Sequence, residues 1–338
     1  MIPLTRMGIA RRAALVLRLG LDGIVGAFAA WAALALAIDG PGSLAGLLFV
    51  VCVALCLRIR PRWRTHAAIA ILIAIVLGWW FALEPSNDRD WQDDVARLPG
   101  VKVLGNQLEV TNVRDFEWTG AEEGRPRWQT RTYSLADVRG VDLVLSDWGA
   151  PMVVHTILSW EFSGGQHLAI SIETRKERDE AYSAVRGAFR QFELAYVVAE
   201  ERDVLGVRAR FRGESLRLYQ LPLPPEEARE LLLVYAGRIE TLAVRPAWYN
   251  ALTTNCTSTI RLHVLDMGLP SPWDWRLLLN GRLDELLHER GRIYPELSLV
   301  ELRARCDVTQ AAREAFGQDD FSARIRAGLP GPPATRGG

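Results

Sequence analysis

The chain carries the stretch Tyr249-Asn-Ala-Leu-Thr-Thr-Asn255-Cys256-Thr-Ser258, in which a polar loop runs into apolar residues spaced as in a helix. Asn255 is a favoured helix N-cap and Gly268 a typical stop signal, so the pattern predicts a helix over residues 256–267. A cysteine in the first helical turn lies at the positive end of the helix dipole, which favours the thiolate. A thiolate is the species that nucleophilic catalysis needs.

A histidine and a glutamate lie upstream on two predicted strands, residues 152–162 and 167–174. Ser163-Gly-Gly between them is typical of a hairpin turn. If the hairpin centres on Gly164, His155 lies opposite Glu173 on the same face of the sheet. We therefore predict a catalytic triad in which Cys256 is the nucleophile, His155 the base, and Glu173 the group that orients the imidazole.

Each member of this triad also has a purely structural interpretation. His155 could be an ordinary strand residue, and Glu173 begins a charged segment typical of a solvated strand end. A shift of one residue in the hairpin register would turn Glu173 to the other face. Cys256 could be a small buried apolar residue, or it could form a disulfide with Cys306, because an exported compartment oxidises thiols. Such a disulfide would exclude the nucleophile.

The N-terminal quarter of the chain predicts a membrane anchor. Hydrophobic residues make up 49% of the sequence, and they concentrate in three runs, residues 23–38, 44–57 and 67–83. With their flanks, all three reach the roughly 17–25 residues that a spanning helix needs, although the middle run is the weakest. A buried hairpin in a soluble core is the alternative. We expect three transmembrane helices over residues 1–83.

The charges predict an orientation for this anchor. Four arginines precede the first run and four fill the loop before the third, whereas acidic residues dominate after Leu83. By the positive-inside rule, the N-terminus is cytoplasmic and the remainder of the chain lies outside the membrane. Residues 1–83 hold eight basic and two acidic residues, a net charge of +6, and the 32 basic and 38 acidic residues that remain give −6. An acidic exported part argues against nucleic acid as a partner.

The exported part predicts an α+β domain with a small antiparallel sheet and helices packed against it. We expect a polar linker over residues 84–100, the domain over 101–325 and a disordered tail over 328–338. Beyond the hairpin, the patterns predict strands at 101–110, 131–133, 141–146 and 207–218, and helices at 176–192, 225–241 and 283–289. No cluster has metal-ligand spacing and no dinucleotide fingerprint is present, so we expect neither metal nor cofactor.

Several separated blocks together resemble the Lnb-like N-terminal periplasmic domain family over about residues 105–270. They are His155-Thr-Ile-Leu-Ser-Trp, Ile170-Ser-Ile-Glu-Thr-Arg, Arg190-Gln-Phe-Glu-Leu, Glu200-Glu-Arg-Asp203 and Tyr249-Asn-Ala-Leu-Thr-Thr-Asn-Cys256-Thr. The resemblance implies a permuted papain/NlpC-like cysteine fold, in which the histidine strand precedes the cysteine helix. It also implies Cys256 as nucleophile, His155 as its partner and Glu173 as the acidic position. Asn255 and Thr257, beside the cysteine, would support the helix cap, the substrate or an oxyanion.

The same resemblance implies acyl transfer at the inner membrane of a bacterium. Cys256 would attack an acyl ester of a lipoprotein or membrane lipid to form a thioester, and an amine would then take the acyl group. Two other functions stay open: a cysteine hydrolase that cuts peptidoglycan peptides or other amides, and an envelope module without catalysis. Fold alone does not decide among them, because the site decides function.

Overall fold

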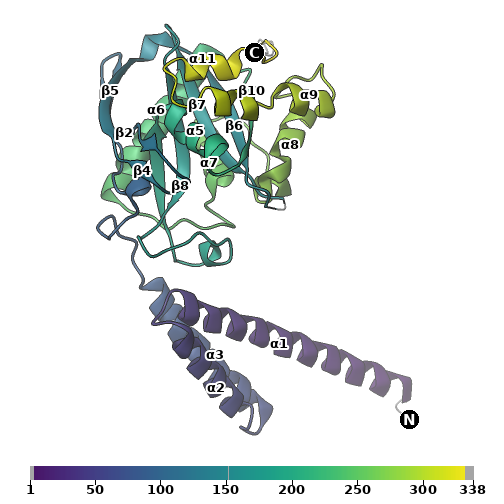
Figure 1. The fold of residues 1–338 in the computed structure, drawn as a ribbon. Helices are drawn as coiled ribbons and strands as arrows, with labels where there is room; N and C mark the ends of the chain where they lie inside the picture. The colour runs from purple at the N-terminus through teal and green to yellow at the C-terminus, as the bar shows by residue number, and fades with distance from the viewer. Residues whose placement is uncertain (1–3, 151, 332–338) are drawn as a thin grey trace. The chain divides into compact units, whose positions relative to one another are not determined.

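The computed structural model describes residues 4–150 and 152–331. The chain divides into two compact units, and Figure 1 labels many of their helices and strands. The first unit holds the residues up to Pro85 together with Phe189–Gln191, and the second holds Ser86–Ala188 and the residues from Phe192 onward.

Three apolar helices make up most of the first unit: α1 (Leu4–Ile38), α2 (Ser43–Cys56) and α3 (Arg62–Phe81). Two segments, Arg11–Ile38 and Arg62–Phe81, are long and apolar enough to cross a membrane. The 14 residues of α2 extend only about 21 Å at 1.5 Å per residue, which is short of a hydrocarbon core of about 30 Å. The sequence predicted three spanning helices, and by length the structure supports two.

One large sheet organises the second unit. Its strands are β1 (Gly100–Leu104), β2 (Gln107–Arg114), β5 (Trp128–Ser134), β6 (Val138–Asp147), β7 (His155–Phe162), β8 (His167–Arg175), β9 (Glu193–Ala199) and β10 (Ser215–Gln220). They lie in the order β1-β2-β9-β8-β7-β6-β10, with β5 pairing to β2. A separate ribbon joins β3 (Glu117–Trp118) and β4 (Gly124–Arg125). The sheet therefore has eight strands, and the expectation of a small one was wrong.

The sheet is also mixed rather than purely antiparallel, because β2 and β9 run parallel where Arg114 pairs with Ala199. The register of β2 against β5 shifts between Val110 and Val113, and Asn112 in this bulge has φ 56°. Bulges bend a strand, and beyond this one β2 reaches β9. The single strand predicted at 101–110 is instead the hairpin of β1 and β2.

The β7–β8 hairpin has the register that its glycine turn predicted. Glu161 pairs with His167, Ser159 with Ala169, and Ile157 with Ser171. Gly164 and Gly165 have φ 82° and 80°, a conformation that residues with a Cβ rarely adopt. Alternation along both strands then determines which side chains share a face.

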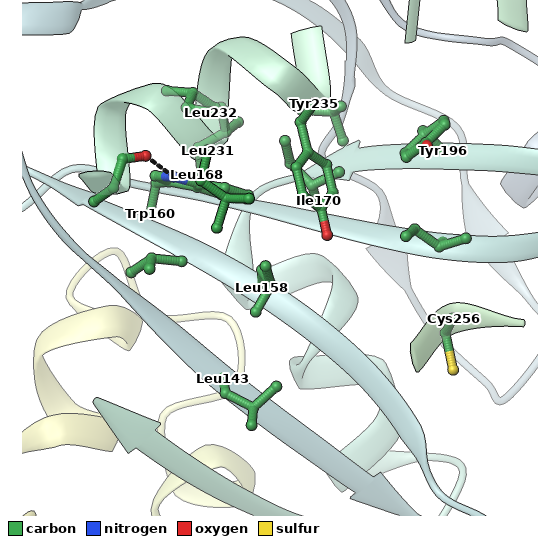
Figure 2. Close-up of a cluster of buried hydrophobic side chains, with 14 of the residues drawn as sticks. Leu143, Leu158, Trp160, Leu168, Ile170, Tyr196, Leu231, Leu232, Tyr235 and Cys256 are labelled. Atoms are coloured by element: carbon green, nitrogen blue, oxygen red, sulfur yellow. Dashed lines mark hydrogen bonds between the residues drawn. The ribbon is translucent and has the colours of Figure 1, made fainter. Parts of the chain in front are cut away.

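Helices cover both faces of the sheet (Figure 1). On one face, α6 (Pro225–Val244), α7 (Cys256–Asp266), α8 (Leu283–Glu289) and α9 (Leu299–Arg305) contribute to a core that includes Leu158, Ile170 and Tyr196. Figure 2 shows part of this core, in which the Trp160 indole N–H donates to the carbonyl of Ala228 at 2.8 Å. On the other face, α4 (Glu201–Val204), α5 (Gly206–Arg210), α10 (Thr309–Glu314) and α11 (Phe321–Arg326) pack over Ile157, Ala169 and Val197.

Two predicted elements were wrong. The segment 176–192 is not a helix but a run of turns with one short 3-10 helix, Arg186–Ala188, and its apolar side chains Tyr182 and Val185 are exposed. The segment 207–218, predicted as a strand, contains α5 before β10 begins at Ser215. Four other 3-10 helices are Asp93–Val95, Leu135–Asp137, Trp275–Leu277 and Asn280–Arg282. In contrast, the helices predicted at 225–241, 256–267 and 283–289 are confirmed as α6, α7 and α8.

The segments at either end of the domain are packed where the structure describes them. In the predicted linker, Trp91 is 5% exposed, and its backbone forms an isolated β-bridge with Glu177. Val95 belongs to the core that α4 and α5 cover. In the predicted disordered tail, Leu329 packs against both cores and the Pro330 carbonyl accepts a hydrogen bond from Tyr294. Residues 332–338 of that tail lie outside the described residues.

Candidate active site

His155 begins β7, and its imidazole contacts two side chains of β8. Its Nε2 lies 2.6 Å from the Ser171 hydroxyl and 3.0 Å from Glu173 Oε1. The Ser171 hydroxyl in turn donates to Glu173 at 2.6 Å, so it accepts from Nε2–H. Because Nε2 faces these two groups, Nδ1 is the nitrogen left for another partner. The strand pairing therefore brings Glu173 into the orienting position beside the imidazole.

An arginine that the sequence did not single out fixes Glu173. Arg208 of α5 donates to Glu173 at 2.8 Å and to Glu214 at 3.1 Å. The Arg208 side chain is 7% exposed, and Ser146 also donates to Glu214. Burial by itself would raise the pKa of Glu173, but the charges of His155 and Arg208 hold it well below its ordinary value. Glu173 is thus a fixed negative charge at neutral pH.

Cys256 is the first residue of α7, and the cap beside it is the predicted one. The Asn255 side chain accepts from the Ser258 backbone N–H at 2.8 Å, and the Ser258 hydroxyl accepts from the Asn255 backbone N–H at 2.9 Å. The Asn255 amide N–H donates to the Ala251 carbonyl at 3.0 Å. These bonds form a capping box that locks the start of the helix. These bonds also occupy both the oxygen and the nitrogen of the Asn255 side-chain amide, so this side chain serves the helix cap.

Cys256 and His155 line the same cleft, and the two groups interact electrostatically. Burial opposes the thiolate, but the neighbouring His155, with the Thr156 backbone N–H, lowers the pKa of Cys256 to about 7. Burial likewise opposes the imidazolium, yet the charge of Glu173 raises the pKa of His155 to about 9. Both shifts favour the thiolate of Cys256 and the imidazolium of His155 at neutral pH, and a thiolate beside an imidazolium is the reactive form of a cysteine nucleophile.

The two residues of the pair come from opposite faces of the sheet. Cys256 belongs to the core between the sheet and the helices α6 and α7. His155 lies on the same face of β7 as Ile157, and α5 packs over that face. They meet at the end of the sheet where β7 begins. Figure 2 shows Cys256 at the margin of its apolar core, with the sulfur pointing away from the other labelled side chains.

A third polar group reaches the sulfur from the loop before α8. The Asn280 amide nitrogen lies 3.7 Å from Cys256 Sγ and donates to the Thr257 hydroxyl at 2.7 Å. The Thr257 and Thr156 hydroxyls are 3.0 Å apart. Thr257, a predicted support residue, is therefore buried beside the sulfur. Sequence reasoning missed Asn280 because a single asparagine in a loop, 24 residues from the cysteine, carries no local signal.

The other cysteine of the second unit is separate from the site. Both Cys256 and Cys306 are free thiols, so the alternative of a disulfide between them is wrong for this structure. Cys306 is fully buried, and burial raises its pKa to about 12. It therefore stays a protonated, unreactive thiol at neutral pH, in contrast to Cys256.

The remaining histidines of the described chain serve structural contacts. His263, two turns along α7, hydrogen-bonds the Tyr196 hydroxyl at 2.9 Å, and burial lowers its pKa to about 4. His167 contacts the Gly165 carbonyl at the hairpin turn, and His66 pairs with Asp22. Residues 4–150 and 152–331 contain no group of three or more histidine, cysteine or acidic side chains arranged to hold a metal.

A cleft with a cavity volume of about 360 Å³ opens onto Cys256, His155 and Glu173. Much of its wall is apolar, with contributions from Trp148, Tyr182, Tyr249, Leu252, Leu278 and Leu279. Trp148, Leu252 and Leu279 are 41%, 59% and 42% exposed, so apolar surface continues to the rim. Asp94, Lys176 and Arg212 line a polar part that continues into a second hollow of about 420 Å³. The cleft is thus amphipathic.

Comparison with protein families identifies one match. Residues 124–281 match the family model described as the Lnb N-terminal periplasmic domain. The matched segment contains Cys256, His155 and Glu173, together with Arg208 and Asn280. Comparisons with curated proteins and with solved structures find no match. Residues 124–281 of this chain belong to the Lnb N-terminal periplasmic domain family.

Proposed function

We propose that this protein is a membrane-anchored periplasmic acyltransferase that carries the acyl group of a lipoprotein or membrane lipid ester as a thioester on Cys256. The observation that carries the proposal is that Cys256 and His155 line one amphipathic cleft, with Glu173 3.0 Å from the imidazole. Family membership supports the periplasmic setting, and the site supports the chemistry.

The first half-reaction forms the thioester. The Cys256 thiolate attacks the ester carbonyl, a carbon–sulfur bond forms, and the carbonyl electron pair moves onto oxygen. When the carbon–oxygen ester bond breaks, the leaving glycerol oxygen takes the proton of the His155 imidazolium. Glu173 stabilises that imidazolium beforehand and keeps the ring oriented for the transfer.

The second half-reaction returns the enzyme to its starting state. An amine attacks the thioester carbonyl while the now neutral imidazole of His155 accepts the amine proton. The carbon–sulfur bond breaks, the amide forms, and Cys256 leaves as a thiolate beside a protonated histidine. A thioester suits this step because a thiolate with a pKa of about 7 is a good leaving group.

The walls of the cleft fit a substrate with an apolar and a polar part. Trp148, Leu252 and Leu279 offer exposed apolar surface for an acyl chain. Lys176 and Arg212, in the polar part, suit a peptide or head group. A membrane anchor keeps such a site near a lipid-borne substrate and raises the effective concentration. We propose that the anchor crosses the inner membrane with its N-terminus in the cytoplasm, as the arginine distribution indicates.

A permuted papain/NlpC-like fold is part of the proposal. The nucleophile starts a helix that packs on a sheet, and a strand of that sheet supplies the histidine, which is the arrangement such enzymes use. Here His155 precedes Cys256 in the chain, the reverse of the order in papain. The eight-stranded mixed sheet is larger than this likeness alone would require.

Acyl transfer can be tested with the full chain in detergent micelles and a synthetic diacyl lipopeptide. Tandem mass spectrometry distinguishes an acyl chain on the glycerol oxygen from one on the N-terminal amine. We expect the wild type to convert the first form into the second, and Cys256→Ala to leave the lipopeptide unchanged. Cys306→Ala is the matched control, because it removes the other cysteine of the second unit and should retain transfer.

Two outcomes would reject the proposal. Cleavage of a muropeptide beside unchanged lipopeptide would identify a cysteine hydrolase, in which water replaces the amine. Absence of both reactions, with no acyl group trapped on Cys256, would identify an envelope module without catalysis.

A further inference from the structure

Several contacts fix the position of the buried Asn280 side chain at the site. It is 2% exposed, and its carbonyl oxygen accepts from the Val154 backbone N–H at 2.9 Å. The next residue, Gly281, donates its backbone N–H to the Met152 carbonyl at 2.9 Å. A Cβ at Gly281 would lie 2.6 Å from the Met152 carbonyl carbon, so only glycine allows this approach. The loop is thereby clamped to the start of β7.

This clamp also determines which way the Asn280 amide points. The Val154 N–H is a donor, so the amide oxygen must face it and the amide nitrogen must face the sulfur. One N–H donates to Thr257 at 2.7 Å. The other has only longer contacts, at 3.3 Å to the Thr156 hydroxyl and 3.7 Å to Cys256 Sγ. The nitrogen therefore has one donor available at the edge of the cleft.

We infer that Asn280 is the side-chain donor that stabilises the oxyanion formed when Cys256 attacks a carbonyl. The oxygen of that intermediate is bonded to the carbon that has just joined the sulfur, so a donor already in contact with Sγ is within reach of it. Backbone N–H groups in the first turn of a helix lack helical partners, so those at Cys256 and Thr257, the first two residues of α7, would share the charge. This inference rests on the proposed thioester chemistry, and it adds a catalytic residue that the Cys256–His155–Glu173 set lacks.

Asn255 is the competing side-chain amide near the sulfur, and its existing hydrogen bonds exclude it as the oxyanion donor. Asn255 lies directly before the nucleophile, but its amide N–H donates to the Ala251 carbonyl and its oxygen holds the helix cap. Rotating it toward a substrate would break the capping box at the base of α7. Asn280 needs no such rearrangement, because its longer contacts to Thr156 and Sγ can give way to a substrate oxygen.

Two reactions of the same sulfur separate an oxyanion donor from a residue that merely activates the thiolate. Alkylation by iodoacetamide is a displacement at carbon that forms no oxyanion, whereas acylation by a small p-nitrophenyl ester does. Both rates are measured on the full chain as a function of pH, in the wild type, Asn280→Ala and Asn280→Asp. The aspartate keeps the shape of the side chain but removes the N–H donor. Asn106→Ala, at an exposed turn, is the matched control.

We expect both Asn280 variants to lose acylation by about 10²–10³-fold, the effect of removing one oxyanion donor, while the plateau rate of alkylation changes by less than about threefold. An alkylation midpoint that stays near pH 7 in Asn280→Ala also shows that this variant has folded around Cys256, because an unfolded cysteine ionises near its ordinary pKa. An equal loss in both reactions would overturn the inference, because Asn280 would then act on the sulfur or the fold. Unchanged acylation would overturn it as well.

The small ester keeps this test independent of the lipid substrate. In one outcome, the wild type transfers no acyl group from lipopeptide, while the Asn280 variants still lose ester acylation and keep alkylation. That result would reject the proposed function and retain Asn280 as a donor. A wild type that alkylates normally but forms no acyl-enzyme with the ester would have no working oxyanion site, and the inference would fail.

Discussion

Replacing Glu173 by glutamine should remove the thiolate of Cys256 near neutral pH, although Glu173 does not supply the nucleophile. Glu173 lies 3.0 Å from the His155 imidazole, and its charge raises the pKa of His155 to about 9 against the effect of burial. Without that charge, burial and Arg208 both act to lower the pKa of His155. The neutral imidazole then no longer stabilises the thiolate.

The size of the effect follows from the two states of the thiol. With a pKa of about 7, Cys256 is about three-quarters ionised at pH 7.5, but at the ordinary value of 9.0 it would be only about 3% ionised. The thiolate fraction should therefore fall by about 25-fold or more, because burial raises the thiol pKa further once the imidazolium is lost. Glutamine keeps the size of the side chain, so the fold should remain.

The assay is the pH dependence of iodoacetamide alkylation at Cys256, with the Cys256→Ala protein as the blank for the other cysteines. The wild-type midpoint should lie near 7, and the midpoint of Glu173→Gln should move to 9 or above. Glu109→Gln, which removes a carboxylate on the distant strand β2, is the matched control and should keep the wild-type midpoint. A midpoint near 7 in Glu173→Gln would refute the argument that the carboxylate maintains the ion pair.

Three further predictions follow from the same contacts. The rate of ester acylation should be bell-shaped in pH: it should rise as Cys256 ionises near 7 and fall as His155 loses its proton near 9, and a profile still rising above pH 9.5 would contradict the ion pair. Arg208→Met should lower the free energy of unfolding by about 3 kcal/mol, because it strands two acidic partners of low exposure, and urea denaturation would measure the loss. Tyr235→Phe should be neutral or slightly stabilising in thermal unfolding, because its buried hydroxyl has no hydrogen-bond partner in the described chain, whereas Tyr219→Phe should destabilise by about 1 kcal/mol through the loss of a bond to a buried carboxylate.

Local patterns in the sequence determined several parts of this site. The cap at Asn255 and the start of α7 at Cys256 depend on residues within one helical turn, so the sequence carries them directly. The register of β7 against β8 follows from a tight glycine turn, and strand alternation then directs His155 and Glu173 to one face. The apolar N-terminal runs are equally local, although the length of α2 is not that of a full span.

Only the tertiary structure decided which residues from distant parts of the chain join Cys256, His155 and Glu173 at the candidate active site. Arg208 follows Glu173 by 35 residues and lies on a segment whose strand-like pattern was misleading, because tertiary packing made it the helix α5. Asn280 reaches the sulfur through a backbone clamp between two segments of the chain, and Cys306 is a free thiol rather than a disulfide partner of Cys256. The parallel contact of β2 with β9 depends on a bulge at Asn112. Each of these features depends on contacts between segments far apart in the chain, and neither residue periodicity nor turn chemistry encodes such contacts.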